Sequence, residues 1–199
     1  MNEPKIIHAI SGPRNISTAL MYSFAQRPNC FVIDEPFYAS FLKRTGLKHP
    51  GREKTLNSYP NSSDGAIERI HEFIRSADKE EIYLKNMAHH MIDVPWHWAS
   101  NAVHVFWIRH PRKVIRSFAK VLPDLTLSDI WIVEQINQWR SIQKLPGRKI
   151  IVDSDEMLSD PNKTFPIICD ALGITFYSEM LSWPRGEKEY DGTWWPHWY

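Results

Sequence analysis

Five short apolar segments constrain the fold of this chain more than any other feature of its sequence. Three of them, KIIHAI, VHVFWI and KIIV, are almost continuously apolar. That pattern is typical of strands buried on both faces of a parallel sheet. We therefore predict five strands, at Lys5–Ser11, Phe31–Asp34, Ile82–Met87, Val103–Arg109 and Lys149–Asp153.

Segments with helical periodicity separate these strands. They cover Ser17–Gln26, Ala66–Ala77, Arg112–Leu122, a stretch from Thr126 to about Lys144, and Asp160–Gly173. Thr126 and Asp129 have the spacing of a capping box. Pro166 predicts a kink or a late start of the last helix, because proline has no backbone N–H. The alternation of strands and helices predicts an α/β fold with three layers around a central parallel sheet.

Two stretches have no clear period. Residues 36–63 are rich in turn-forming pairs and predict a loop with room for a short helix. Such a long loop in a compact domain is usually functional or mobile, so we expect a lid or an acceptor-binding loop. Residues 182–199 form an aromatic tail that ends in WWPHWY. We expect this tail to pack against the body, where it either covers the sheet or contributes to a site.

Length and charge fit a single soluble domain. The 199 residues suffice to bury a core. The 24 Lys and Arg residues balance 23 Asp and Glu residues, which excludes a strongly basic nucleic-acid coat. We expect no nucleic-acid partner, no membrane partner and a cytoplasmic location, since the sequence shows neither a signal peptide nor an apolar run of membrane length. Cys30 and Cys169 fit neither a disulfide framework nor a metal motif.

The first pattern that carries chemistry, ISGPRNISTAL, follows the first predicted strand directly. A tight turn there leads into a helix, so backbone N–H groups and about half a positive charge face one point. Arg14 adds a guanidinium group, and Ser17 and Thr18 add hydroxyls. The pattern indicates a phosphate or sulfate site, although it lacks the Gly-Lys-Ser/Thr of a Walker A loop. The alternative is an ordinary polar turn capped by Ser17.

The second pattern, WIRHPRKVIRSF, follows the fourth predicted strand. Arg109 ends that strand, and open α/β sheets place their ligands at this edge. Ser117 lies two helical turns further on, so the two residues could meet at a second phosphate. On its own, the run of basic residues also fits a solvated helix face.

Together the two patterns, PRxxST and RxPxxVxxS, resemble the phosphosulfate-binding signatures of the sulfotransferase family. The resemblance extends from Lys5 to about Thr175 and is nearest to small bacterial members. It implies a P-loop-like fold and the cosubstrate 3′-phosphoadenosine 5′-phosphosulfate. The residues implied to bind its 5′-phosphosulfate lie in one loop: Pro13, Arg14, Asn15, Ile16, Ser17 and Thr18. Arg109 and Ser117 are implied to bind its 3′-phosphate.

This chain also departs from the family pattern. Ile16 stands where many members have glycine, and Ala19 stands where cytosolic members carry a tryptophan that stacks on adenine. The resemblance therefore leaves the adenine-stacking residue unassigned.

Candidate catalytic groups follow the second and third predicted strands. Glu35 could take a proton from an acceptor hydroxyl, or it could be a turn acid. Lys85 resembles the family's strand-three lysine, which is implied to stabilise the bridging oxygen as it departs. His89 and His90 are alternative bases, and we expect at most one to face the acceptor because adjacent side chains do not share a face. The histidine pair lacks the further ligands of a metal motif, so we expect no metal.

These observations predict sulfuryl transfer to a hydroxyl or amine of a small-molecule acceptor. Arg14 and Lys85 would hold the transferring group, and Glu35, His89 or His90 would act as the base. Two interpretations from other classes remain open. One is a nucleotide or small-molecule kinase on the same fold, and the other is a non-catalytic module that binds a phosphonucleotide. The sequence does not predict the acceptor or the oligomeric state.

Overall fold

The computed structural model describes residues 3–120, 122 and 124–199. Within them, one sheet contains five strands in parallel pairing: β1 (Lys5–Ser11), β2 (Cys30–Asp34), β3 (Glu81–Met87), β4 (Val103–Ile108) and β5 (Lys149–Asp153). The strand order β2-β3-β1-β4-β5 places β1 in the centre. The predicted parallel sheet is confirmed, with every strand boundary within one residue of the prediction.

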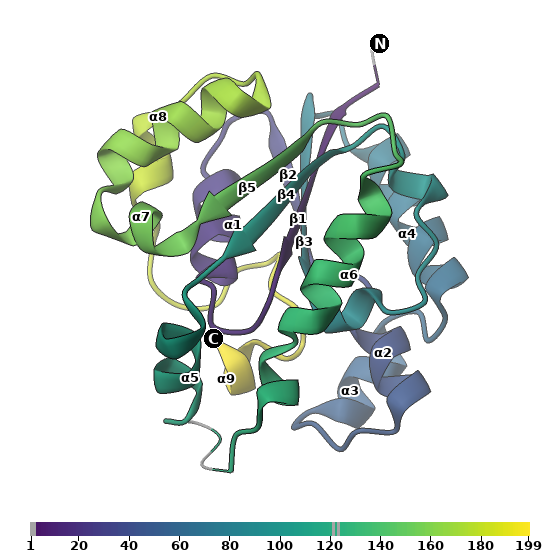
Figure 1. Ribbon diagram of the computed structural model, residues 1–199. Coiled ribbons are helices and arrows are strands. Elements are labelled where there is room, and N and C mark those ends of the chain that lie inside the picture. Colours follow the sequence, from purple (N-terminus) through teal and green to yellow (C-terminus); the bar gives the residue numbers. More distant parts are fainter. Residues whose placement is uncertain (1–2, 121, 123) are drawn as a thin grey trace.

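Helices cover both faces of this sheet (Figure 1). On one side lie α1 (Ser17–Ala25), α7 (Ser154–Ser159) and α8 (Pro161–Leu172), and on the other lie α4 (Ser63–Ser76) and α6 (Ile132–Ile142). Leu20 of α1 and Phe165 of α8 share a core cluster with Ile7 of β1. Ile70 of α4 packs with Ile82 of β3 on the opposite face. Most side chains on both faces of the strands are apolar, which explains why the sheet is covered twice.

The remaining helices and turns surround the carboxyl edge of the sheet or connect its layers. They are α2 (Tyr38–Thr45), α3 (Arg52–Ser58), α5 (Pro111–Phe118), α9 (Trp195–Trp198) and the 3₁₀ turns η1 (Ala88–Met91), η2 (His97–Ala99), η3 (Leu127–Ile130) and η4 (Ser178–Leu181). Among the described residues, no helix is both long enough and apolar enough to cross a bilayer.

The prediction of a loop over residues 36–63 is wrong, because this stretch contains α2, α3 and the start of α4. No side chain of the described residues caps the start of α2, but the first five residues of this helix are buried. Tertiary burial therefore stabilises this helix more than any local signal. Gly46 and Gly51, with φ of 71° and 70°, allow the chain to turn between α2 and α3.

Other predicted helices differ at their ends. The helix expected from Thr126 consists of η3 and α6, which meet at Trp131 with a φ of 53°. The capping box of Thr126 and Asp129 is present, but it caps η3. Of the kink or late start predicted for α8, the late start is wrong, because the helix begins at Pro161 and continues through Pro166. The helix predicted at 112–122 ends at Phe118, and residue 121 of that range lies outside the described residues.

The aromatic tail packs against the body, as expected. Trp194 is 1 % exposed and joins an apolar cluster with Tyr38, Phe41 and Leu42 of α2. Through this contact the tail reaches the carboxyl edge of the sheet, beside the candidate site.

Candidate functional site

The candidate site begins at the turn between β1 and α1. Arg14 and Ile16 in this turn have φ of 61° and 55°, in the left-handed region that non-glycine residues rarely adopt. Neighbouring elements hold the turn in place. Asn15 Nδ2 donates to the carbonyl of Trp107 at 3.1 Å, and Ser154 Oγ donates to the carbonyl of Asn15 at 3.3 Å. Such over-determined backbone strain is typical of binding sites.

The two basic patterns of the sequence meet in one cavity of about 450 Å³. Arg14 Nε donates to Ser117 Oγ at 3.2 Å, and Arg109 Nη1 donates to the carbonyl of Arg14 at 2.9 Å. Ile16, Ser17 and Thr18 also line this cavity. The structure therefore brings together most of the residues predicted to bind the cosubstrate.

Two of the predicted residues lie elsewhere. Pro13 lines a second cavity instead of the first. Asn15 is 3 % exposed and lines neither cavity, because its side chain bonds to β4. It supports the turn from beneath.

Part of the charge of Arg109 is engaged within the protein. Its Nε lies 3.1 Å from Asp155 Oδ1, and Lys113 Nζ lies 3.3 Å from the same oxygen. Arg109 Nη2 makes no hydrogen bond to the described residues, and the side chain still lines the first cavity. Asp155 thus fixes the guanidinium group while one of its terminal nitrogens stays open to a ligand.

Aromatic residues of the tail complete the first cavity. Trp183 and Trp195 line it together with Tyr22 of α1 and Ala19. The aromatic tail is expected to cover the sheet or contribute to a site, but no motif assigns these particular residues to the site. They supply flat apolar surface beside the cationic residues.

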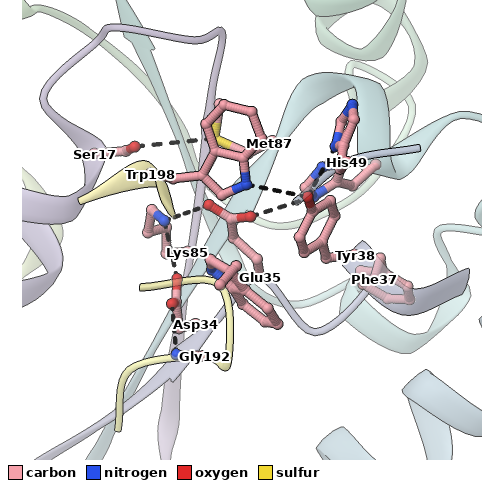
Figure 2. Close-up of polar contacts among 12 residues, drawn as sticks. Ser17, Asp34, Glu35, Phe37, Tyr38, His49, Lys85, Met87, Gly192 and Trp198 are labelled. Atoms are coloured by element: carbon pink, nitrogen blue, oxygen red, sulfur yellow. Dashed lines mark hydrogen bonds and ion pairs between the residues drawn. The ribbon is translucent and has the colours of Figure 1, made fainter. Parts of the chain in front are cut away.

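A buried cluster of charges lies at the ends of β2 and β3 (Figure 2). Lys85 is 1 % exposed, and its Nζ contacts Asp34 Oδ1 at 2.9 Å, Glu35 Oε1 and the hydroxyl of Tyr199. An ammonium group has three protons, so these contacts use all of them. Burial disfavours the charge of this lysine, but the two carboxylates outweigh it and raise the pKa of Lys85.

Glu35 differs from an ordinary surface acid in two ways. Its φ is 41°, and its side chain is buried. Burial raises the pKa of Glu35 above its usual value, although the lysine beside it opposes the shift. Its Oε1 contacts Lys85, whereas its Oε2 makes no hydrogen bond to the described residues and lies 3.6 Å from His90 Nδ1. Glu35 therefore presents one free oxygen of raised basicity.

His89 and His90, of which we expect at most one to face the acceptor, both line the second cavity. They lie in the 3₁₀ turn η1 and not in a strand, so the alternation of strand faces does not apply. His90 stacks on Tyr38, and His89 stacks on Trp131. Burial lowers the pKa of His89 to about 3 and lowers that of His90 well below its usual value. Both rings are therefore neutral near pH 7, and neither Nδ1 has a partner among the described residues.

The second cavity, of about 570 Å³, has an apolar and aromatic wall. Its lining includes Tyr38 and Phe41 of α2, Phe118, Trp131 and, at its floor, Glu35 and Lys85. The two cavities share a wall made of cationic, hydroxyl-bearing and aromatic residues: Arg14, Ser17, Thr18, Trp198 and Tyr199. A group bound at this shared wall can thus be reached from either cavity. Among the described residues, no cluster of three or more His, Cys, Asp and Glu side chains could hold a metal ion.

Comparisons with known proteins add a family and a fold. A family model described as a sulfotransferase domain matches residues 5–199. Two curated proteins of Arabidopsis thaliana, the branched-chain-amino-acid aminotransferase-like proteins 1 and 2, are 36 % and 33 % identical over 100 % and 98 % of this chain. The alignments cover 36 % and 34 % of these relatives, so the chain spans about a third of their length.

Solved structures share the fold. The sulfotransferase domain of the Synechococcus PCC 7002 olefin synthase has a TM-score of 0.67 at 18 % identity, over 99 % of this chain and 84 % of that one. A sulfotransferase domain from the curacin biosynthetic pathway has a TM-score of 0.63 at 16 % identity, over 97 % and 82 %. Mouse sulfotransferase SULT7A1, complexed with PAP, has a TM-score of 0.50 at 14 % identity, over 91 % and 62 %.

Proposed function

Since this chain belongs to the sulfotransferase domain family, we propose that it transfers a sulfuryl group from 3′-phosphoadenosine 5′-phosphosulfate to a small-molecule acceptor. The observation that carries the proposal is the convergence of Arg14, Arg109 and Ser117 in one cavity that shares a wall with a second, aromatic one. One cavity suits an anionic nucleotide, and the other suits the acceptor.

The donor occupies the first cavity. Arg14, Ser17 and Thr18 bind the 5′-phosphosulfate at the N-terminus of α1, where the helix dipole favours an anion. Arg109 and Ser117 bind the 3′-phosphate. Trp183 and Trp195 supply the flat surface for the adenine, in place of the tryptophan that Ala19 replaces. The fit of both charge and shape supports this donor.

The acceptor occupies the second cavity. Its aromatic wall and neutral histidines favour an uncharged molecule with an apolar body. Glu35 Oε2 lies at the cavity floor and can accept a hydrogen bond from the acceptor. A hydroxyl fits this arrangement better than an amine, because a hydroxyl must lose its proton to the base as it attacks.

In the proposed reaction, the acceptor oxygen attacks the sulfur in line with the bond to the 5′-phosphate. A new sulfur–oxygen bond forms, the bond to the phosphate oxygen breaks, and Glu35 takes the hydroxyl proton. Arg14 stabilises the charge on the transferring group. Lys85 reaches the departing oxygen only if one of its three contacts, to Asp34, Glu35 or Tyr199, opens.

Calorimetric titration with adenosine 3′,5′-bisphosphate tests the donor site. The wild-type protein should bind this nucleotide. Arg14→Ala and Arg109→Ala should each weaken binding about 10-fold or more, because a charged hydrogen bond to the nucleotide is lost. Arg116→Ala, on the exposed side of α5, is the matched control and should bind as the wild type does. Unchanged affinity in Arg109→Ala would contradict the assignment of the donor site.

Transfer from a radiolabelled sulfate donor to a library of alcohols, phenols and amines tests the chemistry. The proposal requires transfer that depends on Arg14. Magnesium-dependent turnover of ATP without sulfate transfer would support a kinase instead. Binding of the bisphosphate without transfer to any acceptor would support a non-catalytic module.

A further inference from the structure

Tyr199 brings the aromatic tail into direct contact with the charged cluster. It follows α9 and lies 114 positions from Lys85 in the sequence, yet its hydroxyl contacts Lys85 Nζ. The same hydroxyl lies 2.7 and 2.8 Å from the two carboxylate oxygens of Asp34. Trp194 Nε1 donates to it at 3.1 Å. No motif singled out in the sequence predicts these contacts.

The bonding capacity of the Tyr199 oxygen is fully used. A phenol has one proton to donate and two lone pairs that accept. The proton is shared between Asp34, at 2.7 and 2.8 Å, and Glu35 Oε1, at 3.2 Å, and the lone pairs accept from Lys85 and Trp194. This hydroxyl therefore bridges the anionic and cationic members of the cluster and makes one unit of them.

Glu35 is held by the same unit. Its Oε1 contacts Lys85 and lies 3.2 Å from the hydroxyl of Tyr199. With Oε1 engaged on this side, Oε2 is left free at the floor of the acceptor cavity. The orientation of the free oxygen thus depends on contacts that the other oxygen makes.

We propose that Tyr199 is a positioning residue of the active site: its hydroxyl, held between Asp34 and Lys85, fixes the orientation of Glu35 so that Oε2 faces the acceptor. The role assigned to Glu35 rests on the proposed function, whereas the contacts of Tyr199 do not. Tyr199 and Trp198 also line both cavities, so the tail forms part of the wall between donor and acceptor.

The backbone and a second indole hold the tail in this place. Gly192 N donates to Asp34 Oδ2 at 3.1 Å (Figure 2). Trp198 Nε1 donates to the hydroxyl of Tyr38 at 3.2 Å. The tail is therefore anchored on both β2 and α2, on either side of Glu35.

The titration of Glu35 offers a direct readout of this role. The titratable groups that face Glu35 are Asp34 on β2, Lys85 on β3, His90 on η1, Tyr38 on α2 and Tyr199. The hydrogen bond from Tyr199 stabilises the charged form of Glu35 and so lowers its pKa, against the larger effect of burial. Loss of the hydroxyl should move the pKa of Glu35 upward.

The test is Tyr199→Phe, which keeps the ring and removes the hydroxyl. Carbon-13 NMR titration of glutamate carboxyl groups, with Glu35→Gln to assign the signal, should show a higher Glu35 pKa than in the wild type. The acid limb of kcat/KM should shift to higher pH by the same amount. The value of kcat should fall about 10-fold to 100-fold, as expected when a reacting group is misplaced.

Tyr59→Phe is the matched control. Tyr59 packs on Trp194 in the same aromatic cluster, with ring centroids 5.2 Å apart, and no described hydrogen bond joins its hydroxyl to Asp34, Glu35 or Lys85. This variant should keep the wild-type Glu35 titration. An unchanged Glu35 pKa in Tyr199→Phe, or an equal shift in Tyr59→Phe, would overturn the proposal.

A second substitution keeps the test informative if Tyr199→Phe does not fold. Difluorotyrosine at position 199 retains shape and hydroxyl but is a stronger hydrogen-bond donor, so it should move the Glu35 pKa downward. The absence of that shift would also overturn the proposal. The NMR readout needs no substrate, so loss of the positioning role can be told apart from failure of the proposed sulfuryl transfer, which the nucleotide titration tests separately.

Discussion

The backbone of Glu35 adopts a φ of 41°, a conformation that non-glycine residues rarely hold. It follows directly after β2, and its amide donates to the carbonyl of Lys85 at 2.8 Å. This hydrogen bond to β3 holds the backbone after β2 in a turn. The side chain of Glu35 therefore does not follow the alternating faces of the strand and lines the second cavity. At the scale of single residues, backbone strain and proposed chemistry thus coincide.

Glu35→Gln tests the base directly. The amide keeps the size of the side chain but cannot take a proton, so kcat should fall about 100-fold to 10,000-fold. Binding of adenosine 3′,5′-bisphosphate should not change, because Glu35 does not line the first cavity, where we propose that the nucleotide binds. Glu53→Gln, an exposed acid on α3, is the control for a lost carboxylate. Wild-type kcat in Glu35→Gln, with a large loss in His90→Gln, would transfer the role to the histidine.

At the scale of elements, local pattern predicts the structure where burial and periodicity agree. The strands are predicted well, because burial on both faces requires continuous apolar runs. The turn before α1 is predicted well because it directly follows β1, at the carboxyl edge of the sheet. Helix α2 is not predicted, since contacts with Trp194 stabilise it from the far end of the sequence. The place of Tyr199 is hidden for the same reason: its partners Asp34 and Lys85 are distant in the chain.

The convergence of Arg14 with Ser117 follows the general rule that ligands meet the carboxyl edge of a parallel sheet. The rule predicts where the ends of the strands lie, but it does not predict where the aromatic tail packs against them. It therefore predicts the first cavity better than the second, whose wall comes from α2, η1 and the tail.

The approach of the tail to the site depends on Gly192. A Cβ atom there would lie 2.1 Å from the ring of Trp194, which is 1 % exposed. Gly192→Ala should therefore displace the ring and weaken the anchoring of the tail, at a cost of about 1–3 kcal/mol in the free energy of unfolding. Urea unfolding measures this loss, and kcat should fall with it. Gly186→Ala is the comparison, because a Cβ there meets no atom of the described part of the chain within 4 Å, so only its φ of 87° opposes the change. If Gly192→Ala matched the wild type in both stability and kcat, the tail would not need this close contact.

At the scale of the whole molecule, the core holds several neutral histidines. His8 and His104 are fully buried on neighbouring strands β1 and β4, with their Nδ1 atoms 3.2 Å apart. His89 and His90 are buried in η1. Burial lowers the pKa of all four side chains, to about 4 for His104 and about 3 for His89. The folded protein therefore excludes protons that the unfolded chain would bind.

This difference makes the free energy of unfolding depend on pH. A histidine whose pKa is lowered by folding contributes full stability above its unfolded value of about 6.5 and loses it as the pH falls below that value. Between pH 7.5 and 5.5, each of the four should cost about 1 kcal/mol. Glu35 and Asp191, whose pKa values folding raises, act in the opposite direction, but they titrate from about 4 upward and are two groups against four. Urea unfolding at pH 7.5, 6.5 and 5.5 should show a falling midpoint, and His104→Gln should reduce the slope. A stability that does not change with pH over this range would contradict the prediction. It would mean that the folded protein binds protons at these rings as readily as the unfolded chain does, despite the close contact of His8 and His104 on adjacent strands.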